Sequence, residues 1–161
     1  MPIKFDEKGN PYPYDVVEIN IQKFEQIFSN IPNIERRTLL FQKLGKYLHD
    51  FSTSIIPTSW IQWFGGSYTS TKEFPNDIDL VNFIDARTAE AAMNSIWTFI
   101  TNNKVSADSK KEYSVDGYLI PIFSKTDPRY KITMDKYNYW KKWFGHDRSA
   151  NPKAIVEVTQ K

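Results

Sequence analysis

Cysteine is absent from the sequence, which excludes disulfide bonds and metal sites built on thiolates. Long apolar runs are also absent, because no segment approaches the roughly 20 apolar residues of a membrane-spanning helix. Neither sign of charge dominates, and a net charge of +2 does not by itself indicate a nucleic-acid partner. The first segment, 1–15, has no apolar stretch of the kind found in signal peptides. We therefore expect a cytoplasmic protein with no membrane partner.

The chain has enough apolar residues to build a core of its own. Its 161 residues are 40% hydrophobic, which favours a single domain over 1–161. Aromatic residues make up 16% of the chain. We interpret most of them, including Trp140 and Trp143, as core residues, and a base-stacking surface is the alternative.

The periodicity of apolar residues predicts both helices and strands. Helical spacing recurs over 21–28, 34–51, 87–102 and 134–144. Runs of β-prone residues predict strands over 60–64, 77–84, 113–123 and 154–158. A short helical turn is expected over 67–73 and a polar loop over 106–111. This order of elements predicts an α+β (or α/β) fold with one small mixed sheet flanked by helices.

Two aspartates, Asp77 and Asp79, stand two residues apart in the second predicted strand. Their carboxylates therefore leave the same face of the strand, with Cβ atoms roughly 6–7 Å apart. Two unpaired carboxylates at this separation repel each other, and a hard divalent cation such as Mg²⁺ would relieve the repulsion. A solvated strand end is the alternative interpretation.

A glycine turn precedes this pair. Gly65, Gly66 and Ser67 follow the first predicted strand, and glycine lets the backbone approach a ligand closely and adopt positive φ. If Ser67 begins a short helix, its backbone N–H groups and hydroxyl face an anion such as phosphate. An ordinary tight turn is the alternative. The turn and the carboxylate pair together favour a nucleoside triphosphate site.

A longer motif contains the turn and the carboxylate pair. It consists of Phe64 to Ser67, nine further residues, and Asp-Ile-Asp-Leu from Asp77. This motif resembles the signature of the DNA polymerase beta-like nucleotidyltransferase superfamily. Within it the chain is similar to a set of small bacterial nucleotidyltransferase-like proteins. That likeness extends to Phe-Asp-Glu-Lys-Gly-Asn at 5–10, to Arg-Arg at 36–37 and to the segment 139–148. The resemblance implies a minimal nucleotidyltransferase fold and a third carboxylate on a neighbouring strand.

Asp116 is the acid that matches this third carboxylate. It stands in a β-prone run and shares a face with Tyr118 and Ile120, so an ionised side chain there needs a partner. The two other acids nearby are poorer choices. Asp108 stands in a polar loop with no strand to direct it, and Glu112 adjoins two lysines.

The resemblance also implies a two-metal reaction with Mg²⁺ or Mn²⁺, in which a nucleoside monophosphate moves from an NTP such as ATP to an acceptor hydroxyl. Asp77 and Asp79 would hold the metal that bridges the triphosphate, and Asp116 would complete the second metal site and help to lower the pKa of the acceptor hydroxyl. Gly65, Gly66 and Ser67 would hold the phosphates.

Other basic residues are open to two interpretations. Lys72 follows the glycine turn and could reach a phosphate, and Arg148 and Lys153 flank a turn before the last predicted strand. For all three, the interpretation we favour is a solvated charge, and contact with the triphosphate or the acceptor is the alternative.

The acceptor is not encoded in a recognisable motif. Small proteins that resemble this one modify RNA ends, proteins or small molecules such as antibiotics, and some are toxins paired with an antitoxin partner. The alternative function is a catalytically silent domain of the same fold that binds a nucleotide or a protein partner. A third is a structural subunit that assembles through its aromatic surface.

Overall fold

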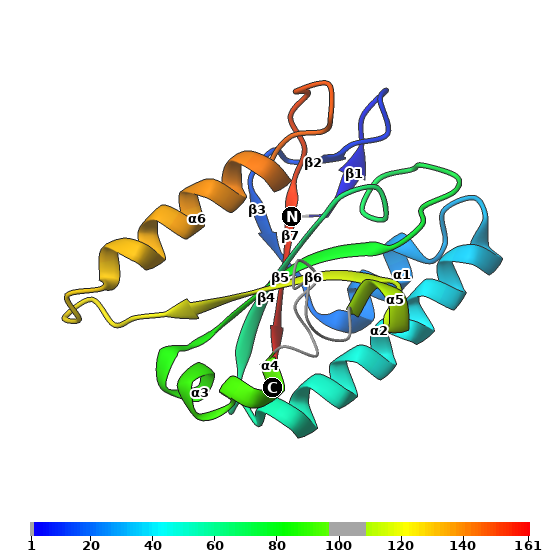
Figure 1. Ribbon diagram of the computed structural model, residues 1–161. Coiled ribbons are helices and arrows are strands. Elements are labelled where there is room, and N and C mark those ends of the chain that lie inside the picture. Colours follow the sequence, from blue (N-terminus) through cyan, green and yellow to red (C-terminus); the bar gives the residue numbers. More distant parts are fainter. Residues whose placement is uncertain (1, 97–108) are drawn as a thin grey trace.

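A five-stranded mixed β-sheet forms the centre of the fold, in the order β3-β7-β4-β5-β6 (Figure 1). The computed structural model describes residues 2–96 and 109–161. The strands of the sheet are β3 (Val16–Glu18), β4 (Trp60–Gly65), β5 (Ile78–Asp85), β6 (Val115–Ile122) and β7 (Ile155–Gln160). The outer pairs β3–β7 and β5–β6 are parallel, and β4 is antiparallel to both β5 and β7. The predicted α+β class with a small mixed sheet is confirmed.

Helices cover both faces of this sheet (Figure 1). The larger core lies on one face, beneath α1 (Ile21–Phe28), α2 (Ile34–Ile55), α3 (Ala86–Ala91), α4 (Met93–Ile96) and α5 (Ser109–Tyr113). The other face is covered by α6 (Tyr130–Phe144), which packs Trp140 and Phe144 against the sheet. No helix in the described part of the chain is both long enough and apolar enough to cross a membrane.

Strand β5 separates the two cores because its side chains alternate between them. Ile78, Leu80 and Ile84 belong to the larger core, as predicted for the first two, whereas Val81 and Phe83 belong to the core under α6. Burial on both faces explains why the strand is an almost continuous apolar run. Asp79 interrupts this run on the α6 face.

The segment before α1 contains strands that the sequence pattern did not predict. Strands β1 (Lys4–Phe5) and β2 (Pro11–Tyr12) form a small hairpin, and β3 pairs with β7 at the edge of the main sheet. Each of the three strands has only two or three residues, which is too short for a period of two to emerge.

Several predicted boundaries need correction. Helix α6 begins at Tyr130, four residues before the predicted start at 134. Helix α2 continues to Ile55, four residues further than predicted, and ends at Ile56, whose successor Pro57 disfavours helix. The predicted helix over 87–102 is divided between α3 and α4, and its last part lies outside the described residues. In the predicted polar loop over 106–111, Ser109 begins α5, because its buried hydroxyl donates a hydrogen bond to the carbonyl oxygen of Val115 at 2.9 Å.

Candidate functional site

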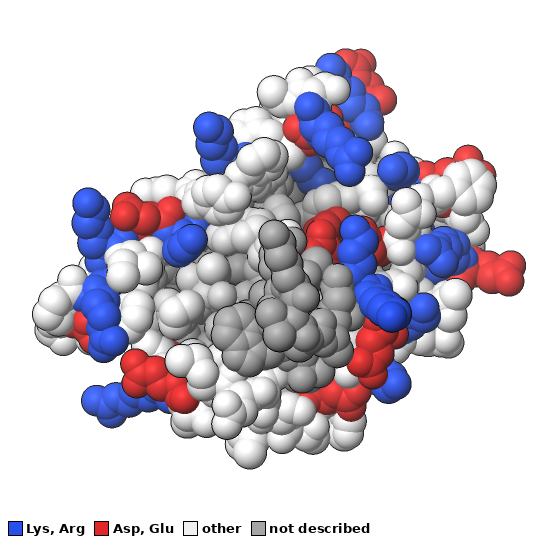
Figure 2. Space-filling model, viewed as in Figure 1, with Lys and Arg blue, Asp and Glu red and all other residues white. Residues whose placement is uncertain are grey.

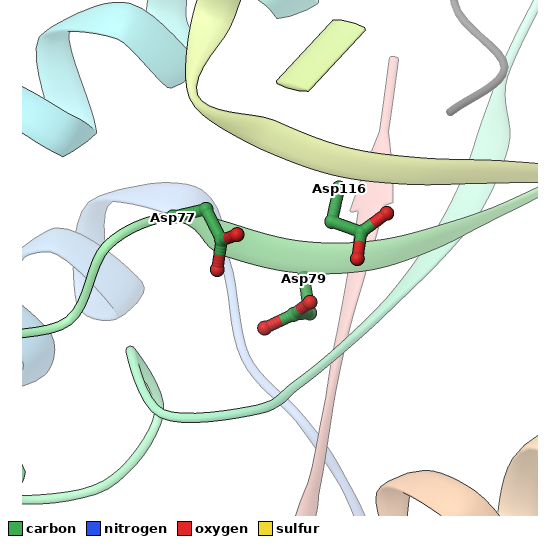
Figure 3. Close-up of side chains that lie close together, drawn as sticks. All are labelled: Asp77, Asp79 and Asp116. Atoms are coloured by element: carbon green, nitrogen blue, oxygen red, sulfur yellow. The ribbon is translucent and has the colours of Figure 1, made fainter. Parts of the chain in front are cut away.

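Three carboxylates converge at one end of the sheet (Figure 3). Asp77 immediately precedes β5, Asp79 is the second residue of β5, and Asp116 is the second residue of β6. The parallel register places Asp79 directly beside Asp116. One oxygen from each of the three side chains lies within 4.8 Å of the other two. The register predicted for Asp116 is therefore confirmed, and we name these residues the carboxylate cluster.

Crowding and burial act together on the carboxylate cluster. Burial raises the pKa of Asp79 to about 7, together with the negative charges of Asp77 and Asp116 and a hydrogen bond that protonated Asp79 donates to Asp116. Oδ1 of Asp116 is buried and has no hydrogen-bond partner in the structure. A buried carboxylate oxygen without a partner is unusual, so the cluster is better suited to a bound cation than to isolation.

Lys110 in α5 provides a cation at the edge of the carboxylate cluster. Its Nζ lies 3.2 Å from Oδ2 of Asp77, and Asp77 raises the pKa of Lys110. More than half of the Lys110 side chain is exposed, so this ion pair contributes little to stability. This contact could not be predicted from the sequence, because Lys110 and Asp77 precede different strands, β6 and β5.

The two glycines of the turn have different roles. Gly66 has a φ of +70°, as expected for a glycine turn, and any side chain at this position would collide with the carboxylate of Asp79. Gly65 belongs to β4, where it is paired with Asp79, and it leaves room for the ring of Phe144. Gly66 therefore supports the carboxylate cluster directly, whereas Gly65 is a packing position.

The turn does not continue into the predicted helix over 67–73. Residues 66–71 form hydrogen-bonded turns, because side chains occupy the carbonyl oxygens that a helix would use. The hydroxyls of Thr69 and Ser70 donate to the carbonyl oxygens of Gly66 and Ser67, at 3.3 and 2.7 Å. A phosphate site built on a helix N-terminus is therefore ruled out here. However, no described residue accepts a hydrogen bond from the backbone N–H of Gly66, Ser67 or Tyr68.

Two adjacent arginines at the start of α2 hold the chain between the turn and Asp77. Arg37 is fully buried, and its guanidinium donates to the carbonyl oxygens of Phe28, Tyr68, Ser70 and Lys72 at 2.7–3.0 Å. Arg36 donates to the carbonyl oxygens of Pro75 and Asn76, both at 3.0 Å. Together they account for the Arg-Arg pair seen in the sequence.

Lys153 is the basic residue that the sequence interpretation placed wrongly. It is only 4% exposed, and its Nζ donates to the carbonyl oxygen of Gly66 at 2.7 Å. Lys72 and Arg148 are both exposed, as expected for solvated charges. Trp140 is buried as expected, but Trp143 is 61% exposed.

The remaining acids stay away from the cluster or cannot be placed. Glu112 is exposed in α5, and Asp108 lies outside the described residues. Charges of both signs alternate over the described surface in Figure 2, and neither forms a continuous patch on that face. The candidate site is therefore identified by the carboxylate cluster and the glycine turn, and not by a large surface patch of positive or negative charge.

Replacing Arg37 should destabilise the whole domain. In Arg37→Met, four carbonyl oxygens lose their donor, two of them in buried hydrogen bonds, and we expect the free energy of unfolding to fall by about 3 kcal/mol or more. Urea denaturation measures this loss. Arg87→Met, an exposed arginine in α3, is the control and should change stability by less than about 0.5 kcal/mol. Equal stability of the two variants would contradict the role assigned to Arg37.

The raised pKa of Asp79 predicts a pH-dependent stability. Between pH 4 and 7 the folded chain holds a proton on Asp79 that the unfolded chain has lost, so the contribution of Asp79 to the free energy of unfolding decreases as the pH rises. Asp79→Asn should therefore stabilise the metal-free protein by roughly 2 kcal/mol at pH 8 and by little at pH 4.5. Urea denaturation in a chelator at both pH values measures this, with Glu112→Gln as the control. The same stabilisation at both pH values would refute it.

Comparisons with known proteins place the chain in one family. No curated protein and no solved structure matches the chain. One family profile, described as a family of unknown function, matches residues 3–159. The match includes the carboxylate cluster, the glycine turn, both arginines and Lys153. The chain therefore belongs to the DUF6932 family.

Proposed function

We propose that this protein is a metal-dependent nucleotidyltransferase with a minimal nucleotidyltransferase fold. It transfers a nucleoside monophosphate from an NTP to an acceptor hydroxyl on an RNA end, a protein or a small molecule. The observation that carries the proposal is the convergence of Asp77, Asp79 and Asp116 beside the Gly66 turn. Metal-binding oxygens and unpaired backbone N–H groups lie on adjoining segments there, as a metal–triphosphate complex requires.

The carboxylate cluster has the donor set of a Mg²⁺ or Mn²⁺ site. All of its ligands are oxygens, and hard divalent cations prefer carboxylates together with phosphate oxygens. The partnerless Oδ1 of Asp116 and the raised pKa of Asp79 both indicate negative charge that no described residue neutralises. When bound, the metal ions would neutralise charge on the phosphates and lower the pKa of the acceptor hydroxyl.

Different residues have different roles in the proposed transfer. Asp77 and Asp79 would hold a metal ion that binds the nucleotide, and Asp116 would hold one that lowers the pKa of the acceptor hydroxyl. The backbone N–H groups of Gly66 and Ser67 bind phosphate oxygens. The acceptor oxygen forms a bond to the α-phosphorus as its proton passes to solvent. The bond from the α-phosphorus to the bridging oxygen breaks, and pyrophosphate leaves with the electron pair.

A labelling experiment tests this proposal directly. The protein is incubated with Mg²⁺ or Mn²⁺, with each NTP labelled at the α-phosphate or the γ-phosphate, and with total RNA, protein extract or small hydroxyl compounds. Label should pass to one acceptor class from the α-phosphate and never from the γ-phosphate. Metal–NTP binding without any transfer would instead support the catalytically silent domain.

The three aspartates should separate into two classes when replaced. Asp77→Asn combined with Asp79→Asn should abolish metal-dependent NTP binding in calorimetry. Asp116→Asn should retain much of that binding and lose transfer by several orders of magnitude.

Glu112→Gln is the matched control and should behave as the wild type. Full transfer activity in Asp116→Asn, or unchanged metal–NTP binding in the double variant, would contradict the assignment.

A further inference from the structure

Lys153 lies two residues before the start of β7, and its side chain extends to the glycine turn. Its backbone N–H donates to the carbonyl oxygen of Gly145 at 2.9 Å, and its Nζ donates to the carbonyl oxygen of Gly66 at 2.7 Å. The side chain thus links the end of α6 to the turn after β4. At 4% exposure it is almost fully withdrawn from solvent.

The hydrogen-bonding capacity of Lys153 is only partly used. An ammonium group has three N–H donors, and Gly66 is the one described residue to which it donates. No carboxylate of the described residues lies within ion-pair distance of Nζ. Burial lowers the pKa of Lys153 to about 8, against the opposing charges of Asp79 and Asp147. A buried cation without an ion-pair partner is costly.

A purely structural role does not account for this cost. A neutral side chain with an amide or hydroxyl donor would hold the Gly66 carbonyl without placing a charge in the protein interior. The charges of Asp79 and Asp147 offset part of this cost from a distance, and an anion in contact with Nζ would offset the rest.

The position of Nζ identifies which anion this is. Gly66 contacts both Lys153, through its carbonyl oxygen, and Asp79, against which its α-carbon lies. Nζ and Asp79 thus both lie against Gly66, the same residue whose backbone N–H has no described acceptor. An anion at this place lies next to the cluster without touching it, as the phosphates of a metal-bound nucleotide would.

The loop that carries Lys153 is fixed before any ligand binds. Asp147 accepts hydrogen bonds from the side chains of Asn10 and Asn151, both at 3.0 Å, and these bonds hold its pKa well below the usual range. Ala154 donates its backbone N–H to the carbonyl oxygen of Pro11 at 2.7 Å. Lys153 is therefore presented by a rigid backbone, which limits the entropy lost on binding.

We propose that Lys153 binds the phosphate chain of the nucleotide and makes the triphosphate, rather than the nucleoside, the part of the substrate that the protein recognises most strongly. This inference rests on the proposed function, in which the carboxylate cluster holds the metal. It adds a ligand for phosphate from the α6–β7 loop, a segment outside the turn and the cluster.

Calorimetry with inorganic tripolyphosphate tests the proposal without assuming a base. Lys153→Gln removes the charge and retains a donor, and Lys153→Met removes both. With Mg²⁺ present, both variants should bind tripolyphosphate about 10- to 100-fold more weakly than the wild type, the loss expected for a charged hydrogen bond. Binding of Mg²⁺ alone should change by less than about twofold, because Lys153 makes no contact with the cluster.

Stability and a matched control separate this role from a structural one. Metal-free Lys153→Met should be at least as stable as the wild type, because it removes a buried charge. Arg148→Gln, an exposed cation in the same loop, should bind tripolyphosphate like the wild type. If Lys153→Met fails to fold, Lys153→Gln carries the test.

Several results would overturn the proposal. These are normal tripolyphosphate binding in Lys153→Gln, an equal loss of affinity for Mg²⁺ alone, or no tripolyphosphate binding by a wild type that binds Mg²⁺. Because no transfer is measured, a failure of the proposed reaction in the labelling experiment is distinguishable from a failure of this inference.

Discussion

The parallel pairing of β5 with β6 is the constraint on which the candidate site depends. A slip of one residue in β6 would turn Asp116 to the opposite face and put Val115 or Gly117 in its place beside Asp79. Apolar side chains prevent this slip, because Val115 and Ile120 must enter the cores on opposite faces of the sheet. The burial of apolar surface, which is favourable, thus forces together three carboxylates that repel one another.

The cations near the carboxylate cluster neutralise it only in part. Arg37 directs its buried guanidinium at backbone carbonyls, Lys153 does the same with its ammonium, and Lys110 pairs with Asp77 at the exposed edge. Among the described residues, none forms an ion pair with Asp79 or Asp116. Positive charge is therefore used to shape the backbone of the site, and the negative charge at its centre stays available to a ligand.

The parts of the site that follow from local periodicity could be predicted from the sequence. Alternation was enough to place Asp77 and Asp79 on one face, and the two glycines marked the turn, whereas Asp116 was matched to a neighbouring strand through the family resemblance. The parts that depend on distant contacts could not be predicted. Arg37 occupies the carbonyl oxygens of a segment more than 30 residues away, so the expected helix after Gly66 does not form.

The burial of basic and aromatic residues in the last part of the chain could not be predicted from the sequence either. Lys153 stands beside a proline and was interpreted as a loop charge, yet its partner Gly66 is 87 residues away in the chain. Trp140 and Trp143 lie three residues apart on α6 in similar local sequences. The way this helix packs on the sheet leaves the ring of Trp143 exposed and buries that of Trp140. The pattern of apolar residues in the sequence does not show how a helix packs on a sheet.

The position of β7 has a consequence for biosynthesis. It is the last strand of the sheet along the chain, yet it lies between β3 and β4. A nascent chain that has emerged only as far as β6 can pair β4, β5 and β6, but β3 has no neighbour and one edge of β4 is open. The carboxylates can thus assemble before Lys153 has been synthesised, and β7 then connects β3 to β4.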